Sequence, residues 1–195
     1  MTDELNNLNP RRSDSGPAWN EIWSQALTHP SVATFDNLIS QPHGTSQRAY
    51  KWVFLSALVG STVATVAGWL RGQSPNWIQL VSIPILALLA LVALMFTAGV
   101  TQLVARAIGG VGNYTQLVFA FATFNAPMAI VTGFIFGTIL LLPLSVYWLT
   151  LNVIAIKAVH HFGWGKAVAS ALPVTLGVLL IPLAAIIILV VNLRS

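Results

Sequence analysis

The sequence predicts an all-α integral membrane protein in which five transmembrane helices follow an amphipathic interfacial segment. Three observations predict this class: the chain is 56% apolar, only 7% charged, and contains long stretches without a charged residue. Soluble domains carry about 25% charged residues, so water cannot be the solvent of most of this chain. We expect a disordered cytoplasmic tail over residues 1–16, an amphipathic cytoplasmic or interfacial segment over 17–50, and a five-helix transmembrane domain over 51–195.

Charged and helix-breaking residues delimit the predicted spans. Lys51 and Arg71 enclose 19 uncharged residues, which make about 28 Å of helix and can cross a bilayer core. The next 34 uncharged residues open on polar QSPN, so we expect the second span to begin near Trp77. The 50 uncharged residues 107–156 would form about 75 Å of helix, which is too long for one crossing. They must hold two spans, with a turn within Ile130–Pro143, where glycine and proline interrupt helices.

The fifth span is expected to begin between Lys166 and Leu172 and to end near Asn192. With five spans, the tail, the second loop and the fourth loop share one side of the membrane and hold seven of the nine Lys and Arg residues. The other side holds only Arg71 and Arg194. Cytoplasmic loops carry the excess of Lys and Arg, so we expect a cytoplasmic N-terminus and a C-terminus outside.

The ionisable residues exclude several kinds of enzyme. No acidic residue follows Asp36, so the membrane region has no carboxylate for a proton relay or a paired-carboxylate mechanism. The chain has no cysteine, which excludes a thiol nucleophile and a thiolate metal site. We therefore expect no enzyme activity, no cofactor and no metal ion. The basic pI of about 10.0 comes from a few cations spread over loops, so we expect no nucleic-acid partner.

Residues 17–29 predict a short amphipathic helix. Asp14 or Ser15 can cap it, Pro17 falls in its first turn, and the proline at position 30 ends it at His29. Its apolar residues recur with helical spacing, and they are Trp19, Ile22, Trp23, Ala26 and Leu27.

This face predicts that the segment lies on the cytoplasmic leaflet, with Trp19 and Trp23 at headgroup depth. A second, shorter apolar face follows at Phe35, Leu38 and Ile39. The alternative is that the apolar face packs against the cytoplasmic loops of the bundle.

The loop GGVGNY, residues 109–114, is a candidate lipid or partner contact. It follows Arg106 and precedes the third span, and exposed backbone amides of such a loop can bind an anionic lipid headgroup. The alternative, which we favour, is a tight turn in which Gly109, Gly110 and Gly112 adopt φ values that other residues resist. No Lys-Ser or Lys-Thr follows these glycines, so the loop is not a nucleotide-binding P-loop.

The fourth loop adds three further candidate contacts, which are Lys157, His160 and Lys166. Anionic lipid at the cytoplasmic surface attracts each basic residue by about 1 kcal/mol, so a headgroup contact from either lysine is one interpretation. His160 and His161 are neighbours on a helix and point about 100° apart, which makes them a poor metal pair. We favour a basic cytoplasmic rim with snorkelling side chains.

Prolines and amides within the spans allow two interpretations. Several prolines lie in or beside the spans, and Asn125 and Asn152 lie inside spans. Together they can build a transport site from broken helices. They can equally be packing features with interhelical hydrogen bonds, which we favour because no span interior holds a charge. Small residues spaced by four positions predict close helix contacts, and they are Gly60, Ala64, Gly68, Gly133 and Gly137.

An ordered set of motifs resembles the Ypt-interacting-protein (YIP) family of five-span membrane proteins. LVARAIGGVGNYTQLVFAFATFNAP (103–127) is similar to the family's GG-x-G loop, aromatic residue and span with a small-residue-proline pair. VYWLTLNVIAIKAVHHFGWGKAVASALP (146–173) is similar to its aliphatic span, basic residue and last-span opening. The lead-in around Trp19, with His29-Pro30 and Thr34-Phe35, resembles prokaryotic members. The resemblance covers about residues 19–193.

The resemblance implies a five-span membrane protein but no specific activity. Eukaryotic YIP proteins bind Rab-type GTPases through a longer cytoplasmic region with a D-L-Y-G-P motif, which this sequence lacks. Binding of a Rab-type GTPase is therefore not supported, and the short tail places the chain among bacterial or archaeal plasma-membrane members.

We expect a non-enzymatic scaffold or accessory subunit that contacts lipids and other membrane proteins or a membrane complex. The second hypothesis is a small-molecule or lipid transporter, which would need a midplane cavity lined by Asn125, Asn152 and proline-freed carbonyls.

Overall fold

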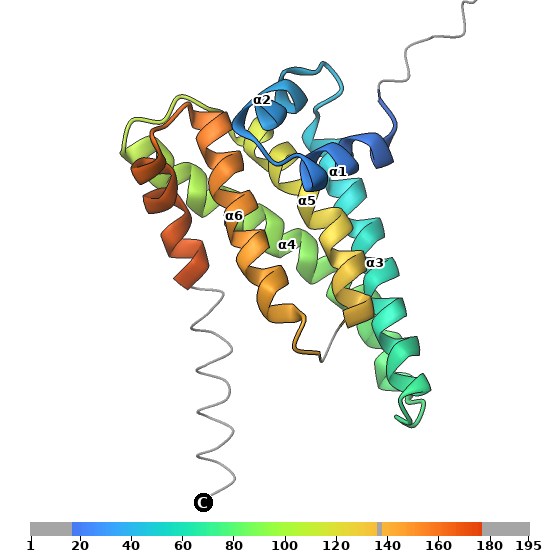
Figure 1. Ribbon diagram of the computed structural model, residues 1–195. Helices are drawn as coiled ribbons and strands as arrows, with labels where there is room; N and C mark the ends of the chain where they lie inside the picture. The colour runs from blue at the N-terminus through green and yellow to red at the C-terminus, as the bar shows by residue number, and fades with distance from the viewer. Residues whose placement is uncertain (1–16, 136–137, 177–195) are drawn as a thin grey trace, which may run out of the picture.

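The computed structural model describes residues 17–135 and 138–176 and contains six assigned helices in them (Figure 1). They are α1 (Trp19–Thr28), α2 (Val32–Ser40), α3 (Ser46–Leu70), α4 (Trp77–Ala107), α5 (Tyr114–Ile135) and α6 (Leu141–His160). A further helical stretch begins at residue 164 and reaches residue 176, the last one described. These two ranges contain no strand.

Four of these helices, α3 to α6, are long and apolar enough to cross a membrane. They confirm the first four predicted spans: α4 begins at Trp77, and the turn between α5 and α6 falls within Ile130–Pro143. Helix α3 begins earlier than expected, at Ser46, so Lys51 lies inside it. The helical stretch from residue 164 begins just before the start expected for the fifth span, and most of that span lies outside the described residues.

Polar side chains define where the long helices begin. The Thr45 hydroxyl accepts a hydrogen bond from the Arg48 amide (3.3 Å) at the start of α3. At the start of α4, Asn76 Oδ1 accepts from the Ile78 amide (3.0 Å), and Gln79 Oε1 accepts from the Asn76 amide (3.2 Å). These bonds satisfy backbone donors that the first turn of a helix leaves without a partner.

The start of α1 differs from the sequence prediction. Ala18 is its N-cap, with no side-chain capping bond, and Pro17 precedes the cap instead of lying in the first turn. The carbonyl of Pro17 accepts a hydrogen bond from Arg48 Nη2 (2.8 Å), so this entry to the helix is fixed by a side chain of α3. The proposed caps Asp14 and Ser15 lie outside the described residues.

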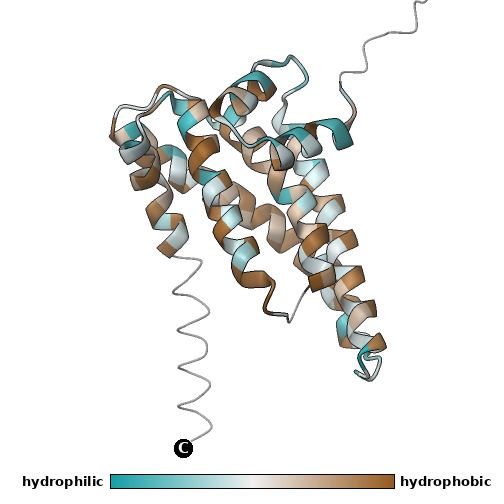
Figure 2. Ribbon diagram, in the orientation of Figure 1, coloured by the Kyte–Doolittle hydropathy of each residue, from teal (hydrophilic) through white to brown (hydrophobic). Residues whose placement is uncertain are grey.

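Helix α5 is the core of the bundle. It contacts α3, α4 and α6, and 61% of its apolar window is buried, compared with 11% for α4. In Figure 1, α3, α5 and α6 run side by side and α4 crosses behind them. Apolar residues dominate these long helices, and hydrophilic residues gather at their ends and on α1 and α2 (Figure 2). This distribution is the one a bilayer imposes on spanning helices.

Two glycines bring α3 and α5 into backbone contact. A Cβ atom added to Gly60 would collide with the carbonyl oxygen of Ala129, and one added to Gly133 would collide with that of Gly60. The predicted close contact is thus confirmed for Gly60 and Gly133. Gly68 instead faces the side chain of Gln73 in the following turn, and Gly137 lies outside the described residues.

The helices α1 and α2 pack against the long helices of the bundle. Ile22 and Ala26 of α1 and Phe35 and Leu38 of α2 are buried. Both helices contact α5, and α2 also contacts α6. The Phe35 ring lies edge-on to Phe124, 6.1 Å away between centroids, and the Tyr147 hydroxyl donates to the Leu27 carbonyl. The periodicity therefore identified the face of α1 that packs on the bundle, and its contacts include the long helices α3, α5 and α6.

We call the end of the bundle near α1 and α2 the capped end. The loops 108–113 and 161–163 lie at this end, and the turn 71–76 lies at the opposite, far end (Figure 1). Helices α4 and α6 thus both end at the capped end. The predicted topology places the second and fourth loops on the same side and therefore requires this.

We expect Gly60→Ala to lower the stability of the protein by about 1–3 kcal/mol, because the added methyl group overpacks the contact with Ala129. The matched control is Gly99→Ala in α4, where an added Cβ meets no atom within 4 Å. Thermal unfolding of both variants in detergent measures the difference. Equal melting temperatures would contradict the contact.

Candidate functional site

The glycine loop 108–113 joins α4 to α5 at the capped end. The amide of Gly110 donates to the Ala105 carbonyl (2.8 Å), and Gly109 has a φ of +93°. Among the described glycines, only Gly72 and Gly109 have positive φ. The sequence prediction that Gly110 and Gly112 also need such φ values is therefore wrong. These two positions require a residue without a side chain for another reason.

That reason is close packing against the end of α6. A Cβ on Gly110 would lie 2.7 Å from His160 Nδ1 and 2.8 Å from Phe162 Cζ. A Cβ on Gly112 would collide with the carbonyl oxygen of Val159. Gln102 Nε2 adds a hydrogen bond to the Gly112 carbonyl (2.9 Å). The loop is thus a packing element between α4 and α6.

The two lysines of this end donate to backbone carbonyls. Lys166 Nζ bonds the carbonyl of Ile108, the C-cap of α4 (3.0 Å), and Lys157 Nζ bonds that of Phe162 (2.7 Å). Lys157 Nζ also lies 5.0 Å from the centre of the Trp164 ring. A positive charge near a helix C-terminus stabilises the helix. Both lysines therefore stabilise the ends of helices. Arg106 is exposed beside them.

His160 is buried between the glycine loop and Phe162. Its exposed fraction is 2%, its ring stacks on Phe162 with 5.4 Å between centroids, and neither ring nitrogen has a hydrogen-bond partner. His161 instead points to the exposed side, with a left-handed backbone at φ 53°. The described residues contain no group of three His, Cys, Asp or Glu able to hold a metal ion.

The two tryptophans of α1 have different surroundings. Trp19 is 54% exposed, and its ring lies 4.6 Å from that of Trp23. Trp23 is partly buried and meets Trp52 of α3 edge-on at 5.9 Å, and Trp52 in turn lies 5.6 Å from Phe119. This row of rings attaches α1 to the bundle and leaves Trp19 at its outer end.

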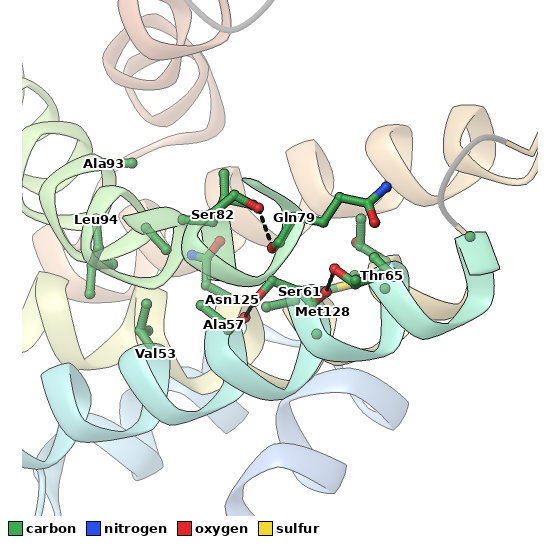
Figure 3. Close-up of a pocket in the computed structure, with 18 of the residues that line it drawn as sticks. Val53, Ala57, Ser61, Thr65, Gln79, Ser82, Ala93, Leu94, Asn125 and Met128 are labelled. Carbon is green, nitrogen blue, oxygen red and sulfur yellow. Dashed lines mark hydrogen bonds between the residues drawn. The ribbon is translucent and has the colours of Figure 1, made fainter. Parts of the chain in front are cut away.

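A pocket of about 650 Å³ lies between α3, α4 and α5 and extends to the far end. We call it the α3–α4–α5 pocket (Figure 3). In Figure 3, Ser61 and Thr65 come from α3, Gln79 and Ser82 from α4, and Asn125 from α5. Small residues on α3 and α4 leave this space, and they are Ala57, Gly60, Ser61, Ala64, Gly68, Ala90 and Ala93.

Sequence reasoning did not find the pocket. The small residues of α3 were interpreted as one stripe for helix contact, because spacing alone does not reveal that two helices diverge beside it. The small residues of α4 facing them were the signal that could have indicated a space.

The pocket differs from the cavity that a transporter was expected to have. Asn125 lines it, but Asn152 does not, and neither Pro84 nor Pro127 is in its wall. Helices α4 and α5 continue through these prolines. Asn125 Oδ1 accepts from Trp148 Nε1 and its Nδ2 donates to the Phe121 carbonyl, both at 2.8 Å. The amide thus makes an interhelical hydrogen bond between α5 and α6, as the packing interpretation predicts.

A comparison with protein-family models identifies residues 24–186 as a Yip1 domain. The match begins within α1, covers α2 to α6 and continues past them. Searches among curated proteins and among solved structures give no match.

We expect Gly110→Val to lower stability by about 1–3 kcal/mol, because its side chain would overlap His160 and Phe162. The lipids that copurify with the folded fraction should stay the same. Gly165→Val is the control, since an added Cβ there meets nothing within 4 Å. Native mass spectrometry and thermal unfolding give the two readouts. Loss of one specific anionic lipid from a Gly110→Val protein of normal stability would instead support a headgroup site in the loop.

Proposed function

Because the chain belongs to the Yip1 domain family and is a multi-pass integral membrane protein, we propose that it is a non-enzymatic scaffold or accessory subunit. It contacts other membrane proteins and lipids through surfaces of its helix bundle. The proposed site is the outward face of α4.

The observation that carries this proposal is the exposure of α4. This helix is the least buried of the four candidate spans, and large apolar residues project from it along its length, among them Leu80, Ile85, Leu89, Val92, Phe96 and Leu103. Phe96 is 70% exposed. Helix α4 packs on α3 and α5 through one face only, so its outward face is available for a partner helix.

The basic residues of the capped end support a cytoplasmic position for this end of the bundle. Arg106, Lys157 and Lys166 all lie there, and cytoplasmic ends carry the excess of Lys and Arg. Trp19, which is half exposed at the outer end of its row of rings, would then lie at headgroup depth. We propose a cytoplasmic N-terminus, a C-terminus outside, and a bacterial or archaeal plasma membrane.

The remaining chemistry favours this function over transport or catalysis. No acidic residue follows Asp36 in the sequence, so no carboxylate is available in the spans to couple an ion or move a proton. Asn125 is engaged in a hydrogen bond between helices. Rab-type GTPases are not among the proposed partners, because the sequence lacks the D-L-Y-G-P motif.

A photoreactive phenylalanine analogue at position 96 tests the partner surface. We expect it to crosslink in living cells to a protein of defined mass, because this position projects outward from α4. The same analogue at Phe134 of α5, which is 62% exposed, is the control and should crosslink lipid alone. Lipid adducts alone at both positions would contradict the proposed role of α4.

A reporter fused after Ser195 tests the orientation. We expect alkaline phosphatase at this position to be active, because this enzyme needs the oxidising compartment outside the cytoplasm, and green fluorescent protein fused there through the same export route to be dark. Fusions that follow Lys157 should show the opposite pattern. An active cytoplasmic reporter after Ser195 would contradict the five-span topology.

A further inference from the structure

The α3–α4–α5 pocket has the dimensions of a ligand site. Small-molecule sites occupy about 300–1,000 Å³, and this pocket holds about 650 Å³. Four of its lining residues are exposed, so the pocket opens to the surroundings of the helices; they are Arg71, Gln73, Leu86 and Ala93. In a membrane those surroundings are lipid, because α3 and α4 are both candidate spans.

Chemistry changes along the length of the pocket. The inner end is apolar and is formed by Val53, Ala57, Leu94 and Met128. The outer end, at the turn between α3 and α4, is polar and is formed by Arg71, Gln73, Gln79 and Ser82. Val53 and Arg71 are 18 positions apart, which is about 27 Å along a helix. This order matches an amphiphile with its chain inside the bilayer and its headgroup at the surface.

The polar atoms between the two ends are satisfied by the protein. The Ser61 hydroxyl donates to the Ala57 carbonyl (2.7 Å), and the Thr65 hydroxyl donates to the Ser61 carbonyl (2.9 Å). The wall therefore presents methyl and methylene groups to an occupant. If the pocket were empty, the apolar atoms that line it would lose dispersion contacts. A hydrocarbon chain from the bilayer is therefore the occupant that fits this wall.

The charge at the mouth selects the headgroup. Arg71 places a positive charge there, and its Nη2 donates to the Phe134 carbonyl (3.3 Å), which holds the guanidinium at the pocket. Arginine recognises phosphate through paired hydrogen bonds, and the amides of Gln73 and Gln79 lie in the same wall. An anionic phosphate-bearing lipid satisfies both the apolar wall and the positive mouth.

We propose that the α3–α4–α5 pocket binds one anionic membrane phospholipid, with an acyl chain along the small residues of α3 and its phosphate at Arg71. The site lies away from the glycine loop and from the outward face of α4. It stands or falls independently of the proposed function, because a crosslinked partner at Phe96 neither requires nor excludes this lipid.

The test is native mass spectrometry of the full chain equilibrated with equal amounts of phosphatidylglycerol and phosphatidylcholine. We expect one retained phosphatidylglycerol per chain.

Ala64→Phe, which fills the pocket, should abolish this adduct, whereas Val66→Phe, on the exposed side of the same helix, should keep it. Arg71→Gln should remove the preference for phosphatidylglycerol, and Arg106→Gln, which removes the same charge at the capped end, should not. Retention of the adduct by a folded Ala64→Phe protein would overturn the proposal, as would wild-type binding without headgroup preference.

A second variant covers the case in which Ala64→Phe does not fold. The chain has no cysteine, so Ser61→Cys introduces a unique thiol in the pocket with almost no change of volume. In lipid nanodiscs its alkylation by N-ethylmaleimide should be slower in phosphatidylglycerol than in phosphatidylcholine. Thr62→Cys, on the exposed side of α3, should react at the same rate in both. Equal rates for Ser61→Cys in the two lipids would also overturn the proposal.

Discussion

The distance between α3 and α5 is the constraint on which the rest of the structure depends. It is set by Gly60 and Gly133, whose backbones leave no room for a side chain. Because α5 is the most buried of the candidate spans, its position determines where its neighbours pack. Helix α6 is joined to it through the hydrogen bond from Trp148 to Asn125, and α2 through the contact of Phe35 with Phe124.

The same segment of α3 also creates the α3–α4–α5 pocket. Successive residues on a helix point about 100° apart, so Gly60 meets α5 while its neighbour Ser61 is turned away from that contact and borders the pocket. Gly60 and Ala64 are four positions apart and share a face, and both also line the pocket. Small residues allow helices to approach closely, but they fill little volume where the neighbouring helix does not approach. One segment thus supplies a tight contact and a pocket beside it.

Charge spacing was sufficient to predict four candidate spans and which of their loops share an end of the bundle, because an uncharged run of fixed length is a requirement of the bilayer itself. It could not predict what covers an apolar face or a glycine. The period of α1 placed Ile22 and Ala26 on one apolar face, but their burial against distant helices follows from tertiary packing. Likewise, Gly110 and Gly112 are small because α6 ends against them, which no local pattern in the loop encodes.

The basic residues show what a count of charges can predict and what it cannot. Lys157 and Lys166 set the predicted orientation, yet in the folded chain both donate to backbone carbonyls near the ends of α6 and α4. Their charge therefore serves the helix ends as well as the membrane side. Arg71 contributes least to the orientation, since it lies on the side with few cations, but it lines the mouth of the pocket. Arg71 also donates to a backbone carbonyl, that of Phe134 near the end of α5. The number of cations on each side predicts topology, whereas the role of each cation depends on the groups that surround it in the folded chain.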